Sequence, residues 1–294
     1  MNATPMLRTR MTSLATAFAM AIVLSSNAGA QDDLTPDVAR NLAKEAWVFG
    51  LPLVMFEKQI DYSTYVTQAE ETRAPINQFV HYRRFVDASN RSIVGFNVDN
   101  LYSLARIDQQ ADPLVLAVPA IGDRYWMMQI VDAWNGVPAA PGSRTLSGDD
   151  PHVFLIAGPD WKGIVPEGME LLRSPTNLGG IGGRTYCAGV DDYAAVNALQ
   201  DQYQLMPLSA WGTPYTPPAS VPLKEGADGE TLVNEQVMAL KAGQFFSNLN
   251  RLMVTNPPYA EDAPTLKKLR RLGIAPGAPF STKGLDAEIG RAHV

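Results

Sequence analysis

Hydrophobic positions near the N-terminus recur at the spacing of an amphipathic helix. Thr35-Pro36-Asp37 is a typical helix start, with a capping hydroxyl, proline at the first position and an acid in the first turn. The apolar stripe that follows, at intervals of four and three, is Val38, Leu42, Ala46, Phe49 and Leu53. Gly50 and Pro52 predict that this helix kinks or ends there.

After residue 79 the pattern changes to short β-prone stretches separated by turn sequences. An aromatic-rich stretch at 79–85 comes first, and the predicted strands are 92–96, 101–107, 114–118, 125–131, 152–156 and 169–173. Many short strands at near-regular spacing are typical of an antiparallel sandwich or barrel. The glycine cluster 179–183 does not match the Gly-x-Gly-x-x-Gly phosphate-binding pattern, and it predicts a tight bend.

Helical character returns in the last third of the chain. Asp191 is the predicted N-cap of a helix over 192–203, and the proline-rich residues 207–229 predict a linker or an extended arm. Residues 230–254 predict the longest helix, and a short helix follows at 264–272. The buried stripe of the long helix is Met238, Ala242, Phe245, Leu249 and Leu252. We expect this stripe to fold back on the β-rich body, with self-association as the alternative.

These elements predict an α+β fold: an antiparallel β-rich sandwich or barrel body with an N-terminal helix and C-terminal helices. The expected division is a signal peptide at 1–30, a β-rich domain at 31–220 and a helical C-terminal segment at 221–294.

The first 30 residues have the order of a cleavable secretory signal. Arg8 and Arg10 precede an apolar stretch at 14–24, and the small residues 28–30 predict cleavage after Ala30. An apolar stretch of 11 residues is too short for a membrane span, which needs about 20. We therefore expect a periplasmic or secreted protein with no membrane span after cleavage.

Composition narrows the function classes. The formal net charge is −6, and an acidic chain with scattered basic residues argues against nucleic-acid binding. The single cysteine, Cys187, excludes an intramolecular disulfide and is predicted to be a small core residue. The three histidines show no metal-ligand spacing, so no metal site is predicted. Nothing in the sequence identifies a cofactor.

Polar and aromatic residues are densest between 81 and 144. In or beside the apolar strands there, alternate positions would place such groups on one face. This face predicts either a structural hydrogen-bond network or a binding pocket in which arginine holds a carboxylate or phosphate. The proposed catalytic residues are Asp99 and His81, as proton-transfer groups. The proposed binding residues are Asn97, Tyr102, Arg83, Arg124, Asp132 and Arg144.

Several segments, in order, resemble the bacterial domain of unknown function 1254 family. The most specific is Asn97-Val-Asp-Asn-Leu-Tyr-Ser103, where the family usually has threonine in place of Asn100. The other segments are 46–53, 81–83, 122–126, 142–144, 158–163, 173–176 and 183–184. The resemblance covers roughly residues 35–220 and implies a β-rich fold and export, but no established reaction. It also implies that most or all of a second domain, of unknown function 1214, which commonly follows, is lacking here.

The leading functional hypothesis is an exported domain that binds, or hydrolyses, a small and anionic organic molecule. The alternatives are a non-catalytic envelope assembly module, which would pair with itself or a partner domain through the C-terminal helices, and a truncated inactive relative. Convergence of the polar side chains in a concave pocket would favour the first hypothesis.

Overall fold

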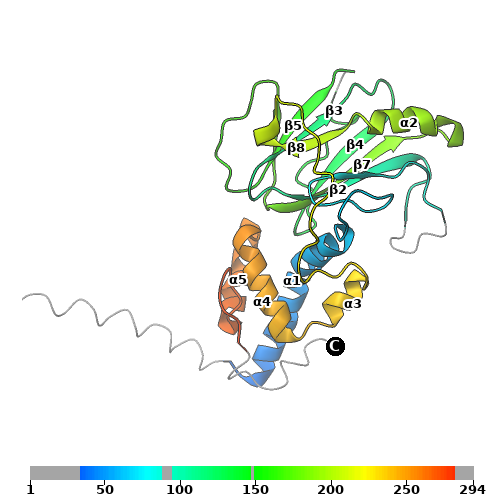
Figure 1. Ribbon diagram of the computed structural model, residues 1–294. Coiled ribbons are helices and arrows are strands. Elements are labelled where there is room, and N and C mark those ends of the chain that lie inside the picture. The colour runs from blue at the N-terminus through cyan, green and yellow to red at the C-terminus, as the bar shows by residue number, and fades with distance from the viewer. Residues whose placement is uncertain (1–33, 88–94, 147–148, 282–294) are drawn as a thin grey trace, which may run out of the picture.

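Two four-stranded sheets pack face to face as a sandwich, and a group of helices lies at one end of it (Figure 1). The computed structural model describes residues 34–87, 95–146 and 149–281. Sheet A has the order β1-β2-β7-β4 and sheet B the order β6-β5-β3-β8. The strands are β1 (Phe79–His81), β2 (Asn100–Asp108), β3 (Leu114–Val118), β4 (Trp126–Asp132), β5 (His152–Ala157), β6 (Glu170–Arg173), β7 (Leu178–Tyr186) and β8 (Gln204–Pro207). The predicted α+β sandwich is confirmed.

All strand pairs of the two sheets are antiparallel except β5 with β6. The predicted strands at 101–107, 114–118, 125–131, 152–156 and 169–173 correspond to β2 to β6. Most of the one predicted at 92–96 lies outside the described residues, as does the predicted signal peptide. Apolar side chains from the facing sides of both sheets, including Ile107, Met128 and Phe154, form the sandwich core.

The glycine cluster is not a bend, as the sequence predicted, but the middle of β7. This strand pairs with β2 on one side and β4 on the other. A Cβ at Gly179 would lie 2.8 Å from the carbonyl oxygen of Val131, and one at Gly183 would lie 2.7 Å from that of Ser103. Glycine is therefore needed because neighbouring backbone approaches closely, rather than because the chain turns.

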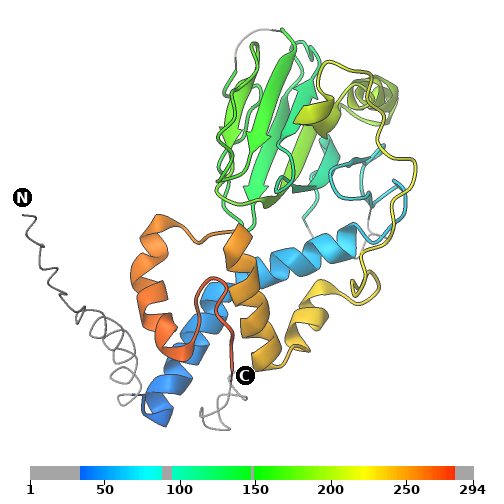
Figure 2. The ribbon, with the colours of Figure 1, turned by 60° about the vertical axis from the view of Figure 1, so that its left-hand side comes forward.

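A long N-terminal helix, α1 (Pro36–Ser63), joins the two parts of the molecule. It begins as predicted, with the Thr35 hydroxyl accepting the Val38 N–H at 3.3 Å. It does not end near Gly50 and Pro52 but continues for about three more turns and changes direction partway (Figure 2). Gly50 is needed for packing, since a Cβ there would lie 2.5 Å from a methyl carbon of Leu249.

The C-terminal segment folds as three helices, α3 (Val233–Met238), α4 (Ala242–Thr255) and α5 (Ala263–Leu269). The single long helix predicted over 230–254 is wrong, because the chain is extended at Lys241 and α4 begins after it. Met238 is 54% exposed, whereas the rest of the predicted stripe is buried. That stripe folds back on the same chain, but it packs mainly on α1, in a cluster to which the β-rich body contributes Ala133.

The helix over 192–203 is shorter than predicted: α2 is Tyr193–Gln200, with one 3-10 turn before it. Residues 211–232 cross the surface as the extended arm that the prolines predicted, and they reach α3 without a helix or strand (Figure 2). Lys224 fastens this arm to Asp61 of α1 at 2.6 Å.

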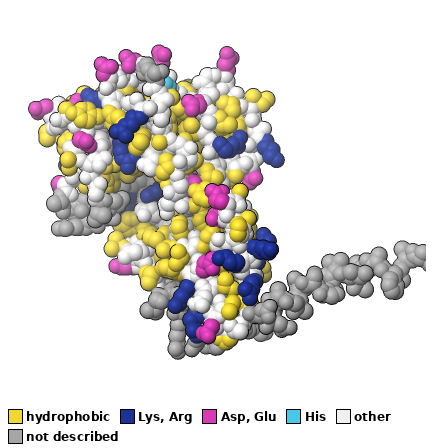
Figure 3. Space-filling model, turned by 180° about the vertical axis from the view of Figure 1, so that it is seen from behind, with side chains coloured by type: hydrophobic (Ala, Val, Ile, Leu, Met, Phe, Trp, Pro, Cys, Tyr) yellow, Lys and Arg dark blue, Asp and Glu magenta, His cyan; other side chains and the backbone are white. Residues whose placement is uncertain are grey.

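Charges of both signs are interspersed over the face shown in Figure 3. No helix among the described residues is long and apolar enough to cross a membrane. Cys187 is buried beside Leu101 and Val196, in agreement with its prediction as a core residue.

Candidate functional site

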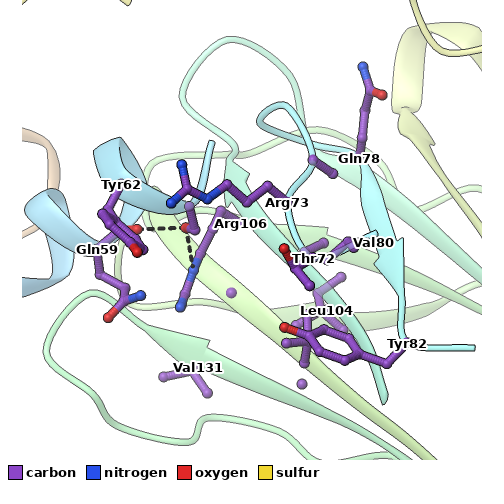
Figure 4. Close-up of a pocket in the computed structure, with 16 residues that line it drawn as sticks. Gln59, Tyr62, Thr72, Arg73, Gln78, Val80, Tyr82, Leu104, Arg106 and Val131 are labelled. Carbon is purple, nitrogen blue, oxygen red and sulfur yellow. Dashed lines mark hydrogen bonds between the residues drawn. The ribbon is translucent and has the colours of Figure 1, made fainter. Parts of the chain in front are cut away.

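A cavity of about 230 Å³ lies between the last turns of α1 and the face of sheet A that is turned away from sheet B. We call it the α1 cavity. Its lining comes from α1, from the loop at 72–78, and from β1, β2, β4 and β7 (Figure 4). The described residues that line it include two arginines and no aspartate or glutamate. In a chain with a net charge of −6, this is a local reversal of sign.

Glycines of β7 form the floor. Gly180 lies opposite Arg106 of β2 and Val131 of β4, and Gly182 lies opposite Leu104 of β2. A Cβ at Gly182 would be in ordinary contact, at 3.7 Å, with Arg184 Nη1 and Gln129 Oε1, so a side chain fits there without a clash. A Cβ at Gly180 would lie 3.2 Å from the Nη1 atom of Arg106. The missing side chain therefore lets the guanidinium lie across the strand.

Arg106 is the charged group that lies deepest in the cavity wall. Its Nε donates to the Ser63 hydroxyl at 3.2 Å, and that hydroxyl donates to the Gln59 carbonyl at 2.6 Å (Figure 4). The guanidinium carbon lies 5.6 Å from the centroid of the Phe56 ring. Among the described residues, no carboxylate forms an ion pair with Arg106.

Burial without a counter-ion is costly for a cation, and it lowers the pKa of Arg106 to about 10. The same burial raises the pKa of Tyr82, while the nearby Arg106 acts in the opposite direction. The phenol of Tyr82 lines the cavity opposite α1 (Figure 4). Both groups are therefore in their usual charge states at neutral pH, arginine as a cation and tyrosine as a neutral donor.

Arg73 lines the cavity beside the exposed Thr72. Its guanidinium carbon lies 4.4 Å from the centroid of the Tyr62 ring, and its Nη1 donates to the Gly229 carbonyl at 2.9 Å. The extended arm is thus attached next to the cavity. A second cation here adds to the positive potential that Arg106 creates.

The residues predicted from sequence lie elsewhere and do not meet in one pocket. Asn97 and Asp99 are exposed, in the turn before β2. The Asn97 N–H donates to the Tyr102 hydroxyl at 2.8 Å, and the Asp99 carboxylate accepts from the Asn100 amide at 2.8 Å. Hydrogen bonding joins only Asn97 and Tyr102 within the predicted set.

His81 is on β1, and its Nδ1 lies 2.9 Å from the Ser103 hydroxyl. Burial, helped by the nearby Arg83 charge, lowers the pKa of His81 to about 4, so the imidazole is neutral at pH 7. Arg83 itself is exposed, and it pairs with Asp201 at 2.7 Å.

The remaining predicted groups have partners within the fold. Arg124 binds Asp192 through two hydrogen bonds, of 2.5 and 2.9 Å, which raise the pKa of the guanidinium and lower that of the carboxyl group. Asp132 is buried, and it accepts from two backbone N–H groups and from the Tyr259 hydroxyl. Arg144 is exposed, with its guanidinium 5.5 Å from the Tyr125 ring centroid. Functional roles for all these residues stay predictions.

Sequence reasoning missed the cavity residues, although one signal pointed to them. Arg106 stands inside an apolar strand with Tyr102 and Leu104 at the alternate positions. Among the described residues, no group of three or more His, Cys, Asp or Glu side chains could hold a metal ion.

The fold is a two-sheet sandwich with a cavity between the outer face of sheet A and the last turns of an N-terminal helix. Residues 76–207 match the family model described as "Protein of unknown function (DUF1254)". The family resemblance is thereby confirmed, and the matched range contains every strand of both sheets. The α1 cavity is built partly from these strands and partly from α1, which precedes the matched range.

Two solved structures are similar to the chain. The VPA0106 protein from Vibrio parahaemolyticus has 22% identity and a TM-score of 0.63, over 87% of this chain and 56% of that one. The chain therefore spans little more than half the length of that structure, and the likeness extends the shared fold beyond the sandwich. An uncharacterized protein from Burkholderia cenocepacia has 16% identity and a TM-score of 0.31, over 46% of this chain and 36% of that one. No curated protein matches the chain.

Proposed function

We propose that this protein binds a small anionic organic molecule in the α1 cavity. The observation that carries the proposal is the partly buried guanidinium of Arg106, which lines a cavity and has no carboxylate partner among the described residues. A buried charge without a counter-ion costs free energy, and a bound anion would recover it. The apolar side chains around the guanidinium suit the organic part of such a ligand.

The cavity favours binding over catalysis. Its described lining residues include no histidine, aspartate, glutamate or cysteine. General acid–base or nucleophilic chemistry at neutral pH normally uses one of these side chains. Hydroxyl groups are present, but Ser63 already bonds to Gln59 and Arg106.

Filling the cavity tests the proposal. Gly182→Val places a branched side chain over the floor, where the nearest atoms would be 3.7 Å from its Cβ. Valine favours strands, so the fold should be kept. We expect the thermal shift produced by a panel of organic anions to disappear in this variant. Gly243→Ala, on α4, where a Cβ would have no neighbour within 4 Å, is the control and should respond as the wild type does. Equal responses in wild type and Gly182→Val would refute the proposal.

Hydrolysis is the second candidate, and one contact favours it. His81 Nδ1 lies 2.9 Å from the Ser103 hydroxyl, which is the spacing of a base and a nucleophile. Ser103 is only 1% exposed, however, so a substrate would reach it only after the sheet edge had opened. Labelling by a fluorophosphonate that is lost in Ser103→Ala would support this candidate. Absence of labelling would leave the binding proposal as it stands.

Export is part of the proposal, since the N-terminal sequence has the order of a secretory signal. The mature protein would then begin at Gln31 and meet its ligand in the periplasm or outside the cell. Mass spectrometry of the mature N-terminus tests this, and recovery of intact Met1 would contradict it. If no ligand of any class is found, an assembly module becomes the better hypothesis.

A further inference from the structure

We infer that the ligand is a monocarboxylate with a compact apolar body, held by its carboxylate group on Arg106. This inference rests on the proposed function and deepens it. It depends on three properties of the α1 cavity, namely the direction of its cation, the nature of its other walls and its size.

The first property is a guanidinium that is already oriented. Arginine carries five N–H donors, and among the described residues Arg106 donates a hydrogen bond only through Nε, to Ser63. Phe56 supports the flat side of the group, and the absence of a side chain at Gly180 leaves room for it. The donors that are left match the two oxygens of a carboxylate. Because the side chain is held before binding, little conformational freedom is lost when the ligand arrives.

The second property is the apolar character of the space next to Arg106. Val80, Leu104 and Val131 line it together with the uncharged polar side chains of Gln78 and Tyr82, and the floor is the backbone at Gly182. A second charged group on the ligand, directed away from Arg106, would be desolvated there without a partner. Arg73 does not supply that partner, since it stacks on Tyr62 and so lies at the same α1 end of the cavity as Arg106, which bonds to Ser63. The cavity therefore favours one negative charge at one end of an apolar molecule.

The third property is size. The cavity has a volume of about 230 Å³. An apolar protein cavity of about 150 Å³ takes benzene, which in proportion gives roughly nine non-hydrogen atoms for this one. Benzoate has that size and the required charge, so it is the probe of choice.

The experiment compares three probes that share a benzene ring by calorimetry on the purified protein. Benzoate has one carboxylate, benzamide is its neutral counterpart, and terephthalate adds a second carboxylate opposite the first. We expect benzoate to bind, and the other two to bind at least ~10-fold more weakly, because a charge-assisted pair is lost in one and a charge is buried in the other.

Variants connect the preference to one residue. Arg106→Met and Arg106→Gln should each weaken benzoate binding by roughly 10- to 100-fold, the range for a lost charge-assisted hydrogen bond. Ser63→Ala keeps the cation but removes its support, and it should weaken binding only a few-fold. Arg270→Gln, at an exposed arginine of the last helical turn, is the matched control and should bind benzoate as the wild type does. Near-ultraviolet circular dichroism checks the fold of each variant, and Arg106→Gln serves if Arg106→Met does not fold.

The failure of this inference can be told apart from that of the proposed function. Equal binding of benzoate and benzamide, unchanged benzoate binding in folded Arg106 variants, or no benzoate binding by the wild type would each overturn the monocarboxylate inference. The broader proposal would still stand if another class of anion gave a response that Gly182→Val removes. The broader proposal would be refuted if no anion gave such a response.

Discussion

Arg106→Met should stabilise the protein in the absence of ligand while it weakens ligand binding. Methionine is unbranched and fills the space of the arginine stem without bringing a charge. The buried cation is then no longer present in the folded state. In a site that binds anions through an unpaired buried charge, removal of the charge should stabilise the ligand-free protein and weaken ligand binding.

The magnitude follows from three contributions. Lowering of the arginine pKa to about 10 corresponds to a cost of about 3 kcal/mol, an upper bound because the side chain is not completely buried. The substitution loses the bond to Ser63, worth about 1 kcal/mol, and the contact with Phe56, worth up to about 1 kcal/mol. Ser63 keeps its bond to Gln59, so no buried hydroxyl is left without a partner. We therefore expect Arg106→Met to raise the free energy of unfolding by about 1 kcal/mol at most.

Calorimetric unfolding at pH 7 and fixed salt measures this difference. One kcal/mol moves the melting temperature of a domain of this size by roughly 2–4 °C, so we expect a rise of that order or less. An anion at a concentration that saturates the wild type should raise its melting temperature, and it should raise that of Arg106→Met by less. A fall of several degrees in the ligand-free variant would refute the reasoning, since it would mean that the guanidinium is a net structural support.

Three further predictions concern residues outside the cavity. His81 has a folded pKa of about 4, below its ordinary 6.5, so the stability it contributes is fully present above pH 6.5 and is lost as the pH falls through 4. This loss of unfolding free energy, about 3 kcal/mol, should be smaller in His81→Asn when urea unfolding at pH 7.5 is compared with that at pH 4.5. An identical pH dependence in the wild type and the variant would contradict the prediction. Asp132→Ala leaves buried donors without an acceptor and should lower the free energy of unfolding by about 3 kcal/mol in the same assay, whereas Tyr259→Phe should lower it by about 1 kcal/mol. If Asp132→Ala lowered it by less than about 1 kcal/mol, the turn would not depend on the carboxylate. Asp99→Asn should leave the melting temperature and the anion response unchanged, because the carboxylate is exposed and accepts a hydrogen bond only from the Asn100 side chain. Loss of a measured activity with an intact fold would instead support the predicted catalytic role of Asp99.

The strands of the sandwich could be predicted because their side chains alternate between core and surface. Leu114–Val118 was predicted at its observed bounds, and β4 and β5 within one residue at each end. The central strand β7 could not be found in this way. Its glycines have no side chains to give a period-two pattern, and glycine is normally depleted in strands. Only the close approach of β2 and β4 explains them, and that is a tertiary contact.

The site was harder to predict than the fold, for a related reason. Polar residues between 81 and 144 were expected to converge, but strand order places them on different faces and ends of the sandwich. Asp132 and Arg124 are satisfied by Tyr259 and Asp192, which lie more than 60 residues away along the chain. Sequence can identify a polar group in an apolar strand, whereas the partner that satisfies it is decided by the fold. The ligand class, an organic anion, was expected from sequence, but the arginine now proposed to hold it was not.

The helix α1 makes the cavity and the C-terminal helices parts of one cooperative structure. Its last turns, with Gln59, Tyr62 and Ser63, form one wall of the cavity. Its earlier turns are covered by the α4 stripe, and Gly50 fits against Leu249. Without α4, the buried apolar face of α1 would meet water, and the wall that orients Arg106 would lose its support. The C-terminal helices are therefore linked to the binding site through packing alone, although no residue of theirs lines the cavity.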